Sequence, residues 1–343
     1  MRRRTPAHCG SRPKGSMTMP RRRPATRTAR LSALLVLALV IACAACAPTG
    51  SDSASTRPVV TTPTPVPSVS ASRVPLIRRT SLAPGDHILT VSVQGRERQL
   101  ILHIPPDGGT GALPLALVYH GGWDTAGGTE SKTNLARQAD EHGYLVAFLQ
   151  GYENSWNDHG RGTAAEAAGV DDIAFTKAAI AEIKAITPVD RARIAAVGFS
   201  NGAFFVDLLG CEMAETFSFL LIAEGQLSTQ LIRQCAPTRP ISVYEVHGNG
   251  DPTVPYDGGS LKDAGYPPSF IVVPVEDAVR QWAAWDRCAM TPERSTEDGT
   301  KFLITTYTGC ADGVTVALRM INGGVHEWPS DVGELVAAGF AAR

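Results

Sequence analysis

The sequence predicts an α/β fold in which helices cover both faces of a mostly parallel sheet, with an antiparallel hairpin near the N-terminus of the folded region. Apolar strand-type runs alternate with helix-type runs from residue 76 to residue 343, and this alternation is typical of such sheets. One strand-type run ends in a G-x-S-x-G stretch at 198–202, and a helix-type run follows it. A serine between a strand and a helix indicates a nucleophile elbow, a tight turn that exposes its hydroxyl group.

The elements before this turn are predicted from the spacing of their apolar residues. Two strand-type runs form a hairpin through Gly95, and two continuous apolar runs are typical of buried strands. The clearest helix has isoleucines at helical spacing and begins at Asp171 or Asp172, either of which can cap it. The predicted strands are 87–93, 98–104, 115–119 and 144–149, and the predicted helices are 135–143 and 171–186.

The elements around and after the turn continue the alternation. The predicted strands are 193–197, 217–223, 241–246, 301–307 and 314–321, and the predicted helices are 202–209, 275–285 and 331–342. Ligands bind open parallel sheets at the carboxyl ends of the strands. The residues directly after these strands are therefore the candidate functional residues.

Residues 1–42 are predicted to be a signal peptide of the lipoprotein type. They contain ten Lys or Arg, no acidic residue, and an apolar run from Leu31 that is too short to span a bilayer. Val40-Ile41-Ala42-Cys43 resembles a lipobox, so Cys43 is predicted to be lipidated and to hold the protein on the extracellular face of the cell membrane. The alternatives are lipidation at Cys46 and an ordinary signal peptide that is cut nearby.

Residues 43–75 are predicted to link the lipidated cysteine to the catalytic domain, which spans 76–343. The segment is rich in Pro, Ser and Thr and shows neither helical nor strand periodicity. Such a composition cannot bury enough apolar surface to fold and behaves as an extended spacer. One domain follows, and it is expected to be a monomer.

The charge balance argues against a nucleic-acid partner. The chain has 32 Lys and Arg and 33 Asp and Glu. Removal of the signal peptide takes away ten basic residues and leaves 22 basic against 33 acidic residues. A surface this acidic repels a phosphate backbone.

Four cysteines remain in the predicted domain: Cys211, Cys235, Cys288 and Cys310. An even number in an exported protein favours two disulfides, and three pairings are possible. The sequential pairing closes two short loops. The alternatives are four buried thiols and, less expected, a zinc site, because no two of these cysteines lie close in sequence.

Ser200 is the predicted nucleophile, and its partners are expected later in the chain. A serine hydroxyl needs a base, normally a histidine that a carboxylate orients, in the chain order Ser, acid, His. His326 fits the base, because a strand-end loop with an acid lies between it and Ser200. Asp251 is the predicted acid, which would accept the Nδ1–H of His326 and leave Nε2 free to deprotonate Ser200.

Two other histidines and two other aspartates in the chain are not the predicted base or acid. His247 ends a strand and is expected to support the turn that presents the acid, and His120 precedes the serine, in the wrong order for the base. Asp257 and Asp263 compete with the chosen acid from a less constrained loop.

The oxyanion hole is expected to use two backbone N–H groups. One belongs to Asn201, directly after the nucleophile, and the other comes from the glycine-containing loop after an early strand, where Gly122 and Trp123 are alternatives. Three tryptophans, Trp123, Trp156 and Trp328, fall on loops at this end and are predicted to form an apolar wall for the substrate, with ordinary packing as the alternative.

These motifs together resemble the secreted esterases grouped as polyhydroxybutyrate depolymerase-like or feruloyl esterase-like, a family that includes lipoproteins. The matching segments follow the family's order and cover most of the predicted domain. They are Tyr119-His120-Gly121-Gly122-Trp123, Trp156-Asn157-Asp158, Val170-Asp171-Asp172-Ile173-Ala174-Phe175, Gly198-Phe199-Ser200-Asn201-Gly202-Ala203, His247-Gly248-Asn249-Gly250-Asp251-Pro252-Thr253-Val254-Pro255-Tyr256 and Val325-His326-Glu327-Trp328-Pro329.

The resemblance implies an α/β-hydrolase fold, a secreted carboxylic-ester hydrolase, and a triad of Ser200, Asp251 and His326. The cysteines also resemble the family's pattern, because one follows the elbow helix and another follows a tryptophan-containing helix. One difference is Val325, where the family usually has glycine before the histidine. A β-branched residue at that position disfavours unusual backbone angles.

The sequence therefore predicts a serine esterase that needs neither a metal nor an organic cofactor. The expected substrates are short-acyl esters, feruloyl or acetyl esters of polysaccharides, and hydroxybutyrate-type esters. Soluble esters are favoured, because no substrate-binding domain follows the catalytic one. The alternatives are an acyltransferase on the same fold and a tethered binding protein without catalysis.

Overall fold

The computed structural model describes residues 82–106, 111–160 and 162–343. The predicted signal peptide, Cys43 and the linker therefore lie outside the described residues. In the described part of the chain, no helix is both long enough and apolar enough to cross a bilayer.

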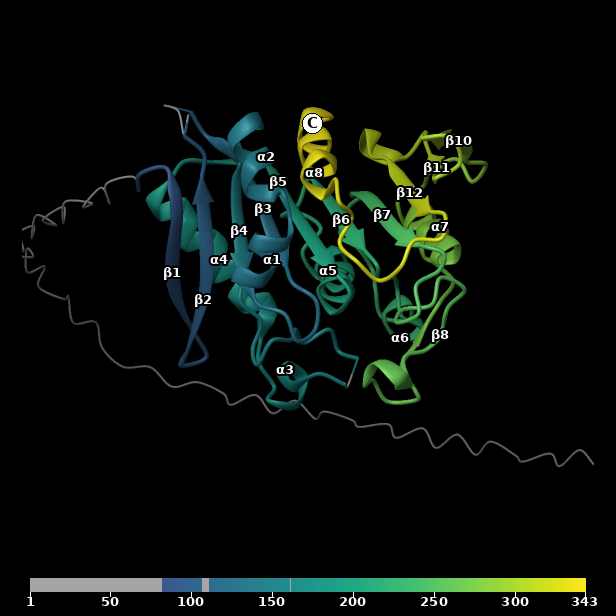
Figure 1. Ribbon diagram of the computed structural model, residues 1–343, viewed down its shortest axis with the longest axis horizontal. Coiled ribbons are helices and arrows are strands. Elements are labelled where there is room, and N and C mark those ends of the chain that lie inside the picture. Colours follow the sequence, from purple (N-terminus) through teal and green to yellow (C-terminus); the bar gives the residue numbers. More distant parts are fainter. Residues whose placement is uncertain (1–81, 107–110, 161) are drawn as a thin grey trace, which may run out of the picture. The chain divides into compact units, whose positions relative to one another are not determined.

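A ten-stranded sheet forms the framework, with the strand order β1-β2-β4-β3-β5-β6-β7-β12-β11-β10 (Figure 1). Six neighbouring strands from β4 to β12 are parallel, and antiparallel strands extend the sheet at both edges. The strands are β1 (Gly85–Val93), β2 (Arg96–Ile104), β3 (Leu113–Tyr119), β4 (Leu145–Leu149), β5 (Val189–Phe199), β6 (Phe219–Ala223), β7 (Ser242–Gly248), β10 (Glu293–Glu297), β11 (Phe302–Tyr307) and β12 (Val316–Ile321).

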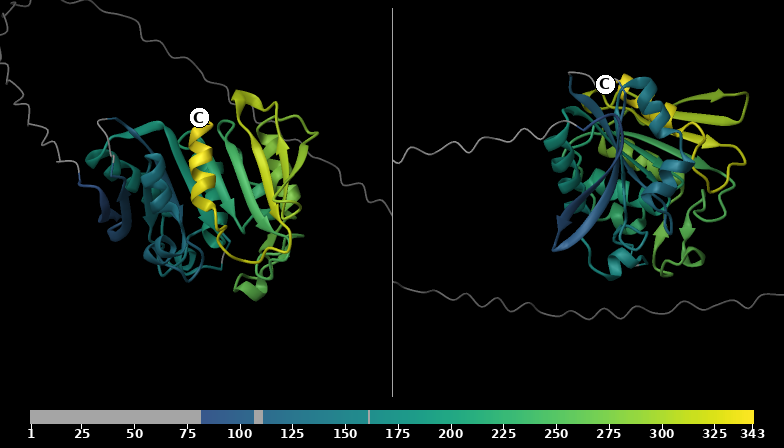
Figure 2. Two further views of the ribbon diagram at one scale, coloured as in Figure 1. Left: turned by 45° about the horizontal axis from the view of Figure 1, so that its top comes forward. Right: turned by 60° about the vertical axis from the view of Figure 1, so that its left-hand side comes forward.

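Helices cover both faces of this sheet (Figures 1 and 2). One face carries α1 (Ala126–Lys132), α2 (Leu135–His142) and α8 (Val332–Ala341), and the other carries α4 (Asp172–Ile186), α5 (Asn201–Glu212) and α7 (Val275–Trp285). Alternate residues of β3 supply the two cores, because successive side chains of a strand point to opposite faces. Leu115, Leu117 and Tyr119 join one core, whereas Ala116 and Val118 join the other.

Short elements occupy the loops near the carboxyl ends of the parallel strands. They are the helices α3 (Ala164–Ala167) and α6 (Thr229–Ile232), the strand pair β8 (Gly259–Ser260) and β9 (Ile271–Val272), and the 3₁₀ helix η1 (Lys262–Ala264). A second 3₁₀ helix, η2 (Ala311–Gly313), follows β11. The loop between β7 and α7 contains β8, η1 and β9, and it contributes to the candidate site.

The predicted strands and helices are all present, and α7 has the predicted bounds. The hairpin turns through Gln94 and Gly95, which both have positive φ. Asp171 is the residue that caps α4, accepting from the Ala174 N–H at 2.7 Å. The strand β10 was missed, because all five of its residues are polar and exposed and give no apolar signal.

Two disulfides join Cys211 to Cys235 and Cys288 to Cys310. This is the sequential pairing, one of the three that the sequence allows. The first ties the end of α5 to the segment after α6, and the second ties the segment after α7 to the segment after β11.

Candidate active site

Ser200 stands alone between β5, which ends at Phe199, and α5, which begins at Asn201. Its backbone has φ 54° and ψ −120°, an uncommon conformation for a residue with a side chain. The turn needs glycine on both sides. A Cβ at Gly198 would lie 2.3 Å from the Gly202 carbonyl oxygen, and one at Gly202 would lie 2.2 Å from that of Tyr119. The stretch therefore has the geometry of a nucleophile elbow.

Ser200, His326 and Asp251 lie in one line of hydrogen bonds. His326 Nε2 is 2.9 Å from Ser200 Oγ, and His326 Nδ1 is 2.6 Å from Asp251 Oδ2. A carboxylate only accepts, so Nδ1 carries the proton and the serine hydroxyl donates to Nε2. The three residues follow β5, β7 and β12, so the parallel sheet brings their loops together at one edge.

The carboxylate of Asp251 is held in its ionised form. Its Oδ1 accepts from the N–H groups of Thr253 at 2.6 Å and Val254 at 2.9 Å. Burial alone would raise the pKa of Asp251, but hydrogen bonds from His247, His326 and Val254 outweigh it and hold the pKa well below its usual range. His326 thus pairs with Asp251 rather than with Asp257 or Asp263.

His247 supports the loop that carries Asp251. The ring is fully buried, and its Nε2 lies 3.0 Å from the Val254 carbonyl oxygen. A carbonyl only accepts, so Nε2 is the donor, and it is also 3.5 Å from Asp251 Oδ2. This is the supporting role that the sequence predicts for His247.

Val325 adopts an ordinary backbone conformation, since it is not among the non-glycine residues with positive φ. Its side chain is 48% exposed, so the branched group points away from the core. The difference from the family's glycine is therefore accommodated without backbone strain, and His326 still reaches both of its partners.

The structure distinguishes the two alternatives for the second oxyanion donor. The Trp123 N–H donates to the Asn154 carbonyl oxygen at 2.8 Å, so Trp123 is not free for this role. In the described part of the chain, the Gly122 N–H has no such partner. A Cβ on Gly122 would lie 3.8 Å from that of Asn201, and Asn201 begins a helix, where N–H groups have no partner within the helix. Gly122 and Asn201 are thus the two available donors.

Trp156 does not form a wall of the site, and this prediction was wrong. Its side chain is 0% exposed and stacks on Phe205 at 5.6 Å between ring centres. The indole N–H donates to the His120 carbonyl oxygen at 2.8 Å, and the backbone N–H donates to Asn201 Oδ1 at 2.8 Å. Trp156 therefore holds the two oxyanion segments in place from inside the core.

Trp328 does not line the pocket over Ser200 either. Its ring stacks on Phe199, 5.1 Å between centres, and contacts the core beneath α8. Phe199 in turn touches the ring of His326 at 4.8 Å. The prediction of a substrate wall is wrong for Trp328 as well, because its ring supports the histidine loop from the side.

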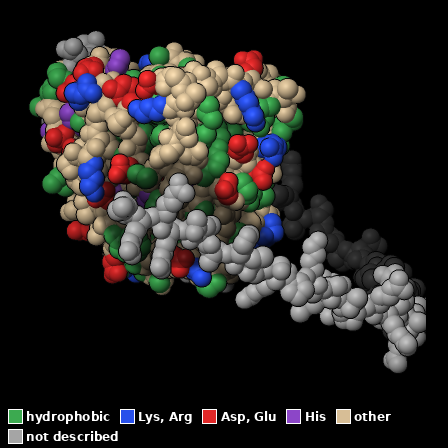
Figure 3. Space-filling model, turned by 45° about the vertical axis from the view of Figure 1, so that its right-hand side comes forward, with side chains coloured by type: hydrophobic (Ala, Val, Ile, Leu, Met, Phe, Trp, Pro, Cys, Tyr) green, Lys and Arg blue, Asp and Glu red, His purple; other side chains and the backbone are tan. Residues whose placement is uncertain are grey.

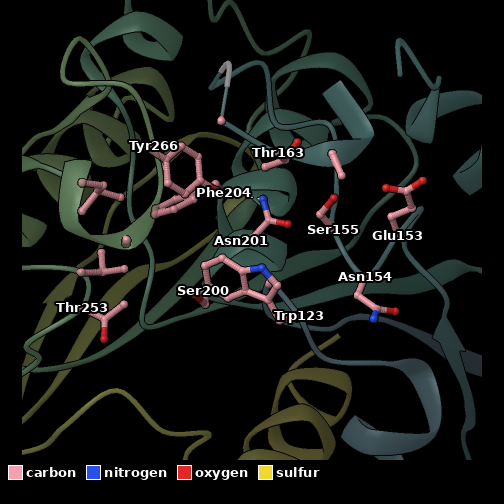
Figure 4. Close-up of a pocket in the computed structure, with 16 residues that line it drawn as sticks. Trp123, Glu153, Asn154, Ser155, Thr163, Ser200, Asn201, Phe204, Thr253 and Tyr266 are labelled. Atoms are coloured by element: carbon pink, nitrogen blue, oxygen red, sulfur yellow. Dashed lines mark hydrogen bonds between the residues drawn. The ribbon is translucent and has the colours of Figure 1, made fainter. Parts of the chain in front are cut away.

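A pocket with about 580 Å³ of empty volume opens over Ser200 (Figure 4). Trp123 lies beside the nucleophile, and its side chain is 80% exposed. The lining includes both apolar or aromatic residues and polar residues, and in Figure 4 Phe204 and Tyr266 lie on one side of Asn201 while Ser155 and Glu153 lie on the other. The first group is Phe204, Val254, Leu261, Ala264 and Tyr266, and the second is Glu153, Asn154, Ser155 and Thr163.

A buried hydrogen-bond network closes one end of this pocket. The Tyr266 hydroxyl donates to Asp158 Oδ2 at 2.7 Å and accepts from Asn201 Nδ2 at 3.0 Å. Asn201 Nδ2 also donates to Asp158 Oδ2 at 2.7 Å. Burial raises the pKa of Asp158 to about 6, although these hydrogen bonds oppose the shift. The network fixes Asn201, whose N–H is predicted to be an oxyanion donor.

Tyr266 was not among the residues predicted for the site. Asp158 stands in a quoted motif, but Tyr266 lies in a Gly- and Pro-containing loop without periodicity, which carries no signal for its role. One group of possible metal ligands in the described chain, Glu224, Asp251 and His326, coincides with the triad. The His326 Nδ1 and both Asp251 oxygens are already engaged in hydrogen bonds there.

The chain is similar to known proteins in both sequence and structure. NocK of Nocardia uniformis subsp. tsuyamanensis, provisionally named as an esterase, is 29% identical over 317 residues, which cover 86% of this chain and 88% of that protein. Feruloyl esterase B of Piromyces equi is 32% identical over 230 residues, which cover 64% of this chain and 41% of that protein. No protein-family model matches the chain.

Among solved structures, an acetyl xylan esterase from Aspergillus awamori is similar with a TM-score of 0.53. The match has 13% sequence identity and covers 75% of this chain and 100% of that one. At this identity the likeness establishes the fold, which is the α/β-hydrolase fold.

Proposed function

We propose that this chain, a carboxylic-ester hydrolase of the α/β-hydrolase fold, cleaves its substrates through Ser200, His326 and Asp251. The observation that carries the proposal is the pair of consecutive hydrogen bonds, 2.9 Å from Ser200 Oγ to Nε2 and 2.6 Å from Nδ1 to Asp251. The serine oxygen attacks the ester carbonyl carbon while Nε2 takes its proton. The imidazolium then returns the proton to the leaving alcohol, and water clears the acyl-enzyme by the reverse sequence.

The negative charge on the carbonyl oxygen would be stabilised by the N–H groups of Gly122 and Asn201. Their segments lie side by side, and both are held by buried hydrogen bonds rather than by solvent. Such preorganised donors stabilise the transition state more than the ground state, and loss of one typically costs about 10²–10³ in rate.

The proposed substrates are soluble esters: short-acyl esters, feruloyl or acetyl esters of polysaccharides, and hydroxybutyrate-type esters. The apolar part of the pocket suits an acyl or aryl group, and the polar part suits a hydroxylated alcohol. The similar proteins are consistent with this range, since they include a feruloyl esterase and an acetyl xylan esterase.

The proposal also includes export and anchoring through a lipidated Cys43, with the catalytic domain as a monomer outside the membrane. The signal-like N-terminus and the two disulfides support an extracellular location. A nucleic-acid partner is not part of the proposal. On the face shown in Figure 3, Lys and Arg side chains are interspersed with Asp and Glu, rather than gathered into the basic patch that nucleic acid attracts.

The test is hydrolysis of p-nitrophenyl acetate by the exported protein and its Ser200→Ala variant. We expect the variant to fold with an unchanged circular dichroism spectrum but to lose measurable hydrolysis and labelling by a fluorophosphonate probe. Ser131→Ala, an exposed serine on α1, is the matched control and should keep both. Retained hydrolysis in Ser200→Ala would contradict the proposal. A panel of aryl, acetyl and hydroxybutyrate esters, with and without a sugar acceptor, would rank substrates and detect acyl transfer.

A further inference from the structure

A second carboxyl group, that of Glu224, lies behind Asp251. Glu224 directly follows β6, and β6 pairs in parallel with β7, whose end presents Asp251. The residue is 0% exposed, and its φ of 50° is uncommon for a residue with a side chain. Its N–H donates to the Val246 carbonyl oxygen at 2.9 Å, while the N–H of Ser200 donates to the Ala223 carbonyl oxygen at 2.9 Å. The backbone at residues 223 and 224 is thus hydrogen-bonded both to β7 and to Ser200.

The carboxyl group of Glu224 faces the acid end of the triad. It accepts from the Gly248 N–H at 3.0 Å, and its Oε2 is 3.4 Å from His247 Nε2. The potential ligand atoms of Glu224, Asp251 and His326 all lie within 4.8 Å of one another. No other element of the described chain places a carboxyl group so close to both Asp251 and His326.

Two buried carboxyl groups this close cannot both be ionised without a large electrostatic cost, so one of them holds a proton. Asp251 accepts from two backbone N–H groups and from His326, whereas Glu224 accepts from one backbone N–H. Burial raises the pKa of Glu224 to about 9, and the neighbouring Asp251 adds to this shift. The proton therefore resides on Glu224, which can donate a hydrogen bond to the ionised Asp251.

We propose that Glu224 is a positioning residue for the base: its carboxyl group shares one proton with Asp251, and it orients His326 itself when the Asp251 carboxylate is absent. The inference rests on the proposed function and goes beyond a three-residue triad. Without Asp251, burial still raises the pKa of Glu224, but the repulsion from the Asp251 charge is gone. The Glu224 carboxyl group then lies within one water molecule of the His326 ring and can accept the proton of its Nδ1–H group in a hydrogen bond.

The other charged groups around Glu224 do not compete for this role. His247, from β7, donates to the Val254 carbonyl oxygen and is engaged there. Glu245, also on β7, is buried, and burial raises its pKa well above the usual value. Glu245 therefore makes a matched control: it is an equally buried acid on the adjacent strand, outside the cluster formed by Glu224, Asp251 and His326.

The test is a double-mutant cycle on kcat/KM for p-nitrophenyl acetate. Glu224→Gln keeps the acceptor for Gly248 but cannot become an anion, so with Asp251 present it should lower kcat/KM by less than about tenfold. Asp251→Ala should lower it about 10²-fold, because Glu224 takes over. The double variant, without either carboxylate, should approach the loss of about 10⁴-fold known for triads that lack the orienting acid. Adding Glu245→Gln to Asp251→Ala should cause no further loss.

Equal factors for Glu224→Gln in both backgrounds would mean a purely structural role and would overturn the inference. If Asp251→Ala does not fold, Asp251→Asn replaces it in the same cycle, with the same expected non-additivity. Ser200→Ala gives the background rate of hydrolysis in this assay. Enzymatic activity that survives in Ser200→Ala counts against the proposed function. If the variants hydrolyse the ester faster than this background but their losses are additive, the result counts only against the role of Glu224.

Discussion

The hydroxyl of Tyr266 lies 2.7 Å from Asp158 Oδ2, although 108 positions separate the two residues in the chain. The contact connects the loop between β7 and α7 with the loop after β4. Because the same hydroxyl accepts from Asn201, it also connects both loops with the nucleophile elbow. The hydroxyl group of Tyr266 therefore holds three segments together at one side of the pocket.

Tyr266→Phe should loosen this side of the pocket while keeping the ring. The ring still stacks on Phe270 at 4.5 Å, but Asp158 loses a donor inside the protein. We expect a loss of about 1.5–3 kcal/mol in the free energy of unfolding, the contribution of a hydrogen bond to a charged group, since Asp158 keeps its hydrogen bond from Asn201. The KM for aryl esters should rise more than kcat falls, because the nucleophile and base are untouched. Urea unfolding and steady-state kinetics measure the two effects.

Tyr244→Phe is the matched control for that experiment. Tyr244 lies on β7, half-buried, and in the described structure its hydroxyl makes no hydrogen bond. Neither stability nor KM should change in this variant. An unchanged KM in Tyr266→Phe would mean that the loop is held by ring packing alone.

Trp123 and Trp156 should respond in opposite ways to truncation. Trp123→Ala removes an exposed ring, so the free energy of unfolding should change by no more than about 0.5 kcal/mol, whereas kcat/KM for aryl esters should fall. Trp156→Ala empties a core position and should cost about 3–5 kcal/mol. Thermal unfolding separates the two variants. Large destabilisation in Trp123→Ala would show that its ring supports the loop rather than the substrate.

These two residues also show how far the sequence could predict the site. The order of motifs located Ser200, Asp251 and His326, because strand-end loops of a parallel sheet converge on one edge whatever the rest of the chain does. A tryptophan in a loop carries no comparable signal. Whether its ring turns inward, as in Trp156, depends on the space left by Phe175 and Phe205, which only the packed structure defines.

The fold was predictable for the same reason as the triad: apolar runs mark buried strands and helices directly. The polar strand β10 has no such run, because it is held by its pairing with β11 rather than by burial. Tyr266 and Glu224 were missed because their roles depend on partners 108 and 27 positions away, Asp158 and Asp251, and neither spacing follows a sequence period.

Arg98 should be important for stability because it forms a buried ion pair. Its guanidinium lies 2.6 Å from Asp172 Oδ1 and stacks over Phe175 at 4.2 Å. Arg98→Met leaves Asp172 buried without its cation, so we expect a loss of about 3–5 kcal/mol in the free energy of unfolding by urea. Adding Asp172→Asn should recover part of that loss, since it removes the uncompensated charge.

The control for this ion pair is Arg96→Met on the same strand. Arg96 is exposed, with its guanidinium 5.2 Å above the ring of Tyr152. The Arg96→Met substitution should change the free energy of unfolding by no more than about 0.5 kcal/mol. Equal losses for the two arginines would mean that the buried charge does not determine the effect.

His103 should make the stability depend on pH in a defined direction. Its Nδ1 is 2.6 Å from Asp86 and its Nε2 is 2.9 Å from Asp140, so it links β1 to α2 through β2. Burial lowers the pKa of His103, but the hydrogen bonds and charges of the two aspartates outweigh it and raise the pKa above 6.5. A histidine with a raised pKa stabilises the folded state fully below its unfolded pKa, and this contribution is lost as the pH rises through the folded pKa.

His103→Gln should therefore cost more at pH 5.5 than at pH 9. We expect about 1 kcal/mol at the lower pH, the upper end for partly exposed pairs, and a smaller difference from the wild type at the higher pH. Urea unfolding at both values measures the two differences. A cost for His103→Gln that is the same at pH 5.5 and pH 9 would indicate that His103 acts as a neutral hydrogen-bonding ring, without a charge shared with Asp86 and Asp140.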